Sequence, residues 1–115
     1  MVRIWNLKTS PSYEFRGAVY HMDTTYSTAN HPIPFNIEKI NSGIEYNNGV
    51  FLILEPGYYR IVTHLKARDN YLHYAITKNS REKLIETRMS VWDATSTSYM
   101  VYLALYDMIY DLSTI

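Results

Sequence analysis

The chain has 115 residues, enough for one domain with a single hydrophobic core. Its formal net charge is zero and its pI is about 6.9, so no overall field attracts nucleic acid or an anionic membrane. The absence of cysteine excludes disulfides and thiolate metal sites. Tyrosine is abundant, at 12 residues, and its large, rigid, polar-tipped side chain favours strands and contact surfaces. The composition predicts an all-β binding domain.

No apolar run approaches the roughly 20 residues of a membrane-spanning helix. Residues 1–5 are too short and too interrupted for the apolar part of a signal peptide, and no Asn-x-Ser/Thr sequon is present. We therefore expect no membrane span. Two readings of the N-terminus stay open: the chain is made without export, or a leader precedes Met1.

Residues 1–12 carry Ile4, Trp5 and Leu7 among polar residues, which predicts an N-terminal arm or a short strand. We expect Trp5 to anchor the terminus rather than to stack on a ligand. Residues 13–22 then alternate between two faces, which is typical of a strand.

The polar residues 23–30 predict a loop. His21, Asp23 and His31 are the one close His and carboxylate grouping, and in principle they suit a metal. Their spacing straddles this loop and matches no specific metal motif, so we interpret them as solvated loop residues.

The strongest strand pattern lies within residues 32–66. An Asn-Asn-Gly turn at 47–49 precedes the apolar run 50–54, which predicts a strand buried on both faces or at the centre of a sandwich. Pro56 and Gly57 then predict a chain reversal. The next strand places one set of residues on one face and a second set on the other: Tyr59, Ile61, Thr63 and Leu65 against Arg60, Val62, His64 and Lys66. One apolar and one mixed face favour an antiparallel sheet.

The C-terminal half predicts four further strands, at 71–77, 83–88, 99–105 and 108–112. Asn79 suits the positive φ of the first connecting turn, and residues 90–98 are expected to be a polar connection. Apolar residues between 99 and 110 also recur at helical spacing, so a helix is an alternative there. Tyr and Val favour the strand.

The sequence carries no nucleophile elbow, paired-carboxylate signature, phosphate loop or nucleotide fingerprint. His64 has no identifiable partner as a general base, and we interpret it as a hydrogen-bonded strand histidine. We expect a protein that is not an enzyme.

Several short motifs follow one another in an order and spacing that can be compared with a known family. They are Pro32-Ile33-Pro34-Phe35-Asn36, Tyr46 before a turn closing on Gly49-Val50-Phe51, and Pro56-Gly57-Tyr58-Tyr59 before a run ending at His64-Leu65. Together they resemble the globular head of the C1q family, within the C1q/tumour-necrosis-factor superfamily. Residues 94–98 and the turn at 106–107 extend the similarity. The resemblance implies a C1q-like jelly-roll β-sandwich of antiparallel strands over residues 13–115, assembled as a homotrimer.

The family's domain continues with a further strand that lies beside its first strand, near the subunit contact, and this sequence does not contain that strand. The strand at 13–22 would then have an open edge, which invites pairing. Three arrangements are open: residues 2–7 pair with this edge, a strand of a neighbouring subunit pairs with it, or the sandwich has one strand fewer.

Several heads of this family hold Ca²⁺ near the trimer axis through Asp carboxylates, and Asp93 matches one of them. The second acidic contributor falls here at Thr87 and Arg88. Because calcium takes about six to eight oxygens and usually more than one carboxylate, we expect no cofactor, with Asp93 as the candidate ligand if calcium is bound.

The resulting prediction is a non-enzymatic recognition and oligomerisation module that binds a protein or carbohydrate surface, secreted or extracellular. Candidate ligand contacts are the aromatic residues of loops and outer faces: Trp92, Tyr26, Tyr46 and Tyr71. The alternative is a structural assembly subunit, such as a fibre-tip or virion coat protein, on a virion surface. Neither interpretation involves nucleic acid.

Overall fold

A computed structural model describes residues 1–7, 16–23, 31–68, 71–80 and 82–113. In these ranges the chain forms strands and no helix, so the alternative helix at 99–110 is excluded. Nothing among the described residues has the length and apolar character of a membrane-spanning helix. The strands are β1 (Val2–Asn6), β2 (Gly17–His21), β3 (Ile37–Ser42), β4 (Ile44–Asn47), β5 (Val50–Ile53), β6 (Gly57–Lys66), β7 (Leu72–Lys78), β8 (Glu82–Met89), β9 (Ala94–Leu103) and β10 (Met108–Ser113).

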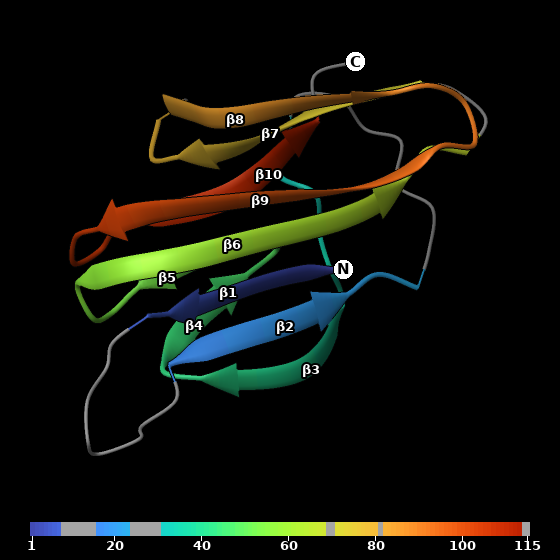
Figure 1. The fold of residues 1–115 in the computed structure, drawn as a ribbon. Helices are drawn as coiled ribbons and strands as arrows, with labels where there is room; N and C mark the ends of the chain where they lie inside the picture. Colours follow the sequence, from blue (N-terminus) through green and yellow to red (C-terminus); the bar gives the residue numbers. More distant parts are fainter. Residues whose placement is uncertain (8–15, 24–30, 69–70, 81, 114–115) are drawn as a thin grey trace.

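The strands form two five-stranded antiparallel sheets that face each other (Figure 1). The first sheet has the order β3-β2-β1-β6-β9 and the second has the order β4-β5-β10-β7-β8. The chain changes sheet between β3 and β4, between β5 and β6, between β6 and β7, and again on both sides of β9. The predicted all-β sandwich is confirmed.

Strand β1 lies inside the first sheet and not at its margin. Ile4 stands opposite Ala18 of β2 on one side and opposite Ile61 of β6 on the other. Strand β2 therefore has a neighbour on each side, β3 and β1. The segment predicted as an arm or a short strand contains a central strand, and residues 8–15 lie outside the described part.

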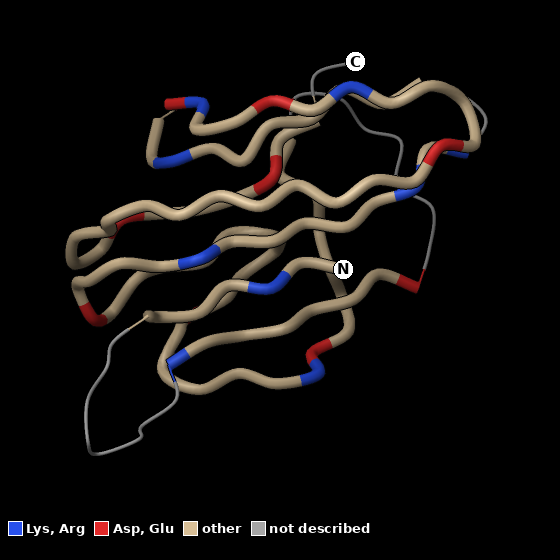
Figure 2. Tube along the Cα trace, in the orientation of Figure 1, with Lys and Arg blue, Asp and Glu red and all other residues tan. Residues whose placement is uncertain are grey.

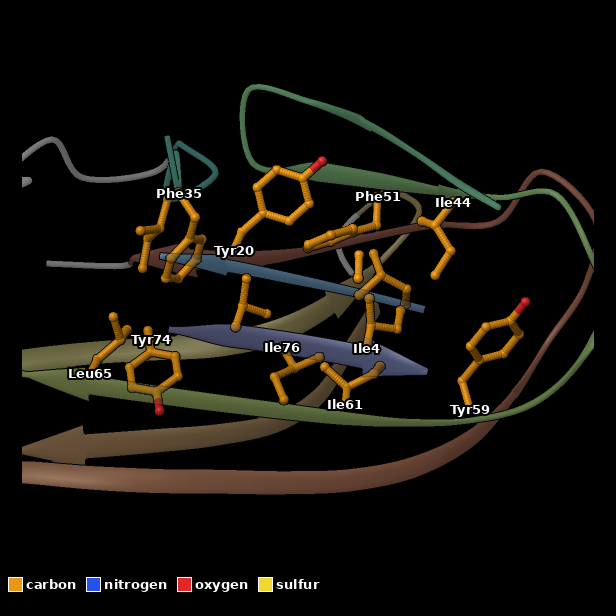
Figure 3. Packing of buried hydrophobic residues seen from close by; sticks show 14 of the residues in the cluster. Ile4, Tyr20, Phe35, Ile44, Phe51, Tyr59, Ile61, Leu65, Tyr74 and Ile76 are labelled. Carbon is orange, nitrogen blue, oxygen red and sulfur yellow. The ribbon is translucent and has the colours of Figure 1, made fainter. Parts of the chain in front are cut away.

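The core fills the space between the two sheets (Figure 3). Alternate residues of each strand point inward, because side chains of a strand alternate between its faces. The largest side chains with less than 2 % of their surface exposed include Tyr59, Tyr74, Phe35, Phe51 and Ile4. Burying an aliphatic or aromatic side chain of this size stabilises a fold by about 1.5–3 kcal/mol.

Strand β6 confirms the predicted alternation. Tyr59, Ile61, Thr63 and Leu65 are buried, and the residues between them face outward. The predicted turns are also present, with Asn48 at φ 46° and Asn79 at φ 54°, both in the left-handed region that asparagine tolerates.

The structure differs from the sequence predictions in three places. The strand predicted at 50–54 ends at Ile53: Phe51 and Ile53 are buried and Val50 and Leu52 are half-buried, as suits an inner strand of the sandwich, while Leu54 beyond its end is 44 % exposed. The polar connection ends at residue 93, because Ala94 already pairs with Lys66. Strands β3 and β4 were not predicted, since their polar sequences show no clear alternation; they are joined at Gly43, with φ 76°.

Candidate functional site

The outer face of the first sheet combines aromatic and cationic side chains. Four of its five strands, β1, β2, β6 and β9, contain no Asp or Glu, and the fifth, β3, contains Glu38 and Lys39. The outward residues of β6 stand opposite those of β9: Tyr58 with Tyr102, Arg60 with Met100, Val62 with Ser98, His64 with Ser96 and Lys66 with Ala94. On its other side β6 meets β1, which places Trp5 opposite Arg60 and Arg3 opposite Val62.

One end of this face carries exposed apolar side chains, which we call the aromatic patch. Tyr58 and Tyr102 pack edge to face with ring centroids 5.4 Å apart, yet 60 % and 52 % of their surfaces remain exposed. Two turns meet at this end, because the Tyr106 amide donates to the Ile53 carbonyl at 2.7 Å. The patch consists of Leu54, Tyr58, Met100, Tyr102, Leu105 and Tyr106, all more than two-fifths exposed.

Strands β1 and β6 carry the cationic row, which we define as Arg3, Arg60 and Lys66, the last residue of β6 (Figure 2). The Arg3 guanidinium lies 4.2 Å from the centroid of the Trp5 ring. The Arg60 guanidinium donates to the Ser98 hydroxyl at 3.0 Å. Neither contact neutralises charge, so the row stays positive.

His64 lies within the cationic row. Its Nδ1 is 2.8 Å from the Ser96 hydroxyl, which confirms the predicted hydrogen-bonded strand histidine.

Trp92 and Tyr106 are held outward by unusual backbone conformations. Their φ angles are 67° and 68°, in the left-handed region that bulky side chains rarely occupy. Trp92 is 58 % exposed and Tyr106 is 64 % exposed, so neither ring compensates this strain by burial. Positions of this kind cost roughly 1–3 kcal/mol and concentrate at functional sites.

The predicted ligand contacts do not come together. Trp92, between β8 and β9, lies beside the cationic row, with its ring centroid 5.8 Å from the Lys66 ammonium. Tyr71 is 63 % exposed just before β7 of the second sheet. Tyr46 stacks on Tyr20 at 3.9 Å, and burial raises the pKa of its hydroxyl to about 12. Tyr46 thus serves packing, and Tyr26 lies outside the described residues.

Asp93 supports its own turn. Its carboxylate accepts a hydrogen bond from the Ser90 amide at 3.2 Å, and its carbonyl accepts from the Ala67 amide at 2.8 Å. Asp23 is likewise engaged, since its carboxylate accepts from the Asn36 side chain at 2.7 Å. Among the described residues no group of three or more His, Asp or Glu side chains has the proximity that a metal needs.

A buried carboxyl joins the two sheets. Asp111 of β10 is 3 % exposed, and both of its oxygens lie 2.9 Å from the Thr63 hydroxyl of β6. Burial raises the pKa of Asp111 to about 7, and the Thr63 hydrogen bond opposes this shift only in part. Nearby, the Thr97 hydroxyl lies 2.9 Å from the Tyr74 hydroxyl and 2.6 Å from that of Thr87.

Sequence reasoning missed Tyr58, Tyr102 and Tyr106, which the pairing of β6 with β9 and the meeting of two turns bring to one end. The available sequence signal was the alternation of strand side chains between two faces. This alternation assigned Arg60 to the mixed face of its strand, but it does not say which other strands lie beside that strand.

Comparison with known proteins leaves the family open. No protein-family model matches the chain, and no curated protein is found as a relative. The C1q-like resemblance stays a prediction, which rests on the residues that carry it.

Proposed function

We propose that this chain is a non-enzymatic recognition and oligomerisation module, a C1q-like jelly roll that assembles as a homotrimer and binds a protein or carbohydrate surface. The aromatic patch is the observation that carries the proposal. Tyr, Met and Leu side chains gathered at one end of a sheet have the composition of an interface centre. Monomeric proteins rarely leave such a cluster in water unless it has a partner.

The position of β1 supports the same proposal. In the C1q family the strand that follows the region matched here lies beside the first strand, near the subunit contact. In this chain β1 lies beside β2, where Trp5 stands opposite Gly17. A strand beside β2 is what the proposed family fold requires, and the pairing of β1 with β2 supports the proposal to that extent.

Symmetric self-association gives the aromatic patch a function. A trimer covers apolar surface that one 115-residue sandwich leaves exposed, and it presents its outer faces in several copies. Linked copies convert weak contacts into avidity that exceeds a single contact by about 10²- to 10⁴-fold.

Light scattering coupled to size exclusion tests the assembly. We expect the mass of a trimer that dissociates on dilution. Replacing Tyr58 and Tyr102 together with Ser should weaken association by at least about tenfold, which corresponds to about 1.4 kcal/mol. The matched control is Tyr71→Ser, which removes an equally exposed ring outside the patch. A monomer at all concentrations would overturn the trimer.

A specific observation favours the structural subunit as a second candidate. Strand β9 forms one margin of the first sheet, extends over 10 residues and carries no charge. Long uncharged edge strands promote pairing between chains, and lysine on such an edge blocks it. If the chain builds fibres or coats, light scattering will detect large regular particles, and Ser96→Lys will disperse them. Particles that persist in Ser96→Lys would contradict assembly through β9.

A further inference from the structure

We propose that the outer face of the first sheet binds a linear acidic polysaccharide, whose carboxylate or sulfate groups pair with Arg3, Arg60 and Lys66. This inference rests on the proposed recognition function and names its ligand class. The ligand would run along β6, between the aromatic patch at one end and Trp92 at the other.

The charges on this face lack the compensation that other cations of the molecule have. Arg16 pairs with Glu55 at 2.8 Å, and Lys83 pairs with Glu86 at 3.1 Å. Within the described residues, none of the three cations of the row has a carboxylate within salt-bridge distance. A net charge of zero for the whole chain therefore hides a positive face. An anionic ligand gains from that field without first displacing an internal carboxylate.

The spacing suits an extended polymer. Arg3 lies diagonally across from Arg60, because Arg3 pairs with Val62 and Trp5 pairs with Arg60. From Arg60 to Lys66 the strand rises about 20 Å, at about 3.3 Å per residue. The row is thus long enough to contact several sugar units in succession.

The two arginines are held ready for anions. The face of the Trp5 ring supports the Arg3 guanidinium, and the Ser98 hydroxyl fixes that of Arg60. A guanidinium presents five donors in a planar fork that matches the two oxygens of a carboxylate or sulfate. Partial immobilisation before binding lowers the entropy that association must offset.

An aromatic ring at the far end of the row, away from the aromatic patch, suits a sugar ring. Trp92 is 58 % exposed, and the Lys66 ammonium lies 5.8 Å from its ring centroid. The apolar C–H faces of a sugar pack on such rings while its hydroxyl groups stay in water. This pairing of aromatic surface with a few charged groups gives both affinity and orientation.

An acidic peptide fits this face less well. Peptides gain most from a sheet at its edge, where they add a strand through main-chain hydrogen bonds. On the outer face only side chains are available, so the peptide's amides would go without strand partners. A second copy of this chain laid face to face would bring Arg3 and Arg60 against their own equivalents, and like charges oppose that contact.

Binding measurements with defined polymers test the proposal. We use heparin as the sulfated probe, polygalacturonate as the carboxylated probe, dextran as the neutral probe and poly-glutamate as the acidic peptide. We expect heparin or polygalacturonate to bind at about 0.15 M salt, and more weakly as salt rises because screening increases. Dextran and poly-glutamate should bind at least about tenfold more weakly.

Matched variants locate the contact. Replacing both Arg3 and Arg60 with Gln should weaken binding at least about tenfold. The control combines Lys83→Gln with Arg88→Gln, which removes the same charge from β8 of the second sheet. This control should change binding less than about twofold. If the first variant unfolds, Lys at both positions keeps the charge but loses the guanidinium fork. That variant should bind with intermediate affinity, and unchanged binding would count against the contact.

The outcomes separate this inference from the proposed function. A trimer that binds neither anionic polysaccharide overturns the inference and leaves the oligomerising module standing. Equal affinity for poly-glutamate overturns the carbohydrate assignment, and equal losses in the two double variants overturn the location. If the protein is a monomer that binds heparin through Arg3 and Arg60, the proposed trimer is wrong and the proposed binding face is correct.

Discussion

Asp111→Asn should remove most of the change in stability that the protein undergoes between about pH 4 and pH 7. The folded state holds the pKa of Asp111 at about 7, against an ordinary value of 3.8. Between these two values the folded protein binds more protons than the unfolded chain, so the free energy of unfolding falls as pH rises. Above about pH 7 both states are ionised and this loss is complete.

The size of the effect follows from the shift. About three pKa units at about 1.4 kcal/mol each give about 4 kcal/mol as the upper limit of the loss. Urea unfolding at a series of pH values measures the change directly. Asparagine matches the shape of Asp and does not ionise, so the slope that Asp111 causes should be absent from its curve.

Thr63→Val provides the companion test. The Thr63 hydroxyl donates to the Asp111 carboxylate, so its removal should raise the pKa of Asp111 further and steepen the loss of stability. Val has a similar shape, which keeps the packing of β6 intact. If Asp111→Asn shows the same pH dependence as the unmodified chain, the titrating group lies elsewhere.

Ile4→Ala should destabilise the fold by about 2–5 kcal/mol, the usual range for a buried Ile replaced by Ala. Ile4 has no exposed surface, and its strand joins β2 to β6. Thermal or urea unfolding measures the loss. A small loss would mean that β1 is dispensable and that the sheet does not depend on its N-terminal strand.

The control for this prediction is the neighbouring outward residue. Arg3→Gln lies on the same strand with its side chain exposed, so it should change stability by no more than about 0.5 kcal/mol. A loss as large as that of Ile4→Ala would place the stabilising contacts of β1 on its outer face.

The elements that sequence reasoning predicted best have a strict period of two. In β6 the buried set and the exposed set separate cleanly, and Asn79 marks its turn by a conformation that few residues tolerate. The elements that sequence reasoning missed or shortened are more polar. β3 has little apolar content and was not predicted. The first half of β9 is rich in Ser and Thr that face both water and the core, so its polarity suggested a loop.

The candidate site was predicted only in part. Trp92 was singled out as an exposed aromatic residue, and the structure places it beside Lys66. Tyr46 was singled out on the same grounds, but its ring packs on Tyr20. Composition cannot separate the two cases, because a tyrosine suits a core and a surface equally well.

The sequence alone determined the all-β class, the single core and the two faces of β6, because these depend on spacing along one chain. Only the tertiary structure decided that β1 lies between β2 and β6, that Asp111 meets Thr63, and that Arg3 and Arg60 share one face. Each of these depends on which strands become neighbours. Strand pairing is non-local and is selected by the packing of the whole sandwich, so no local pattern specifies it.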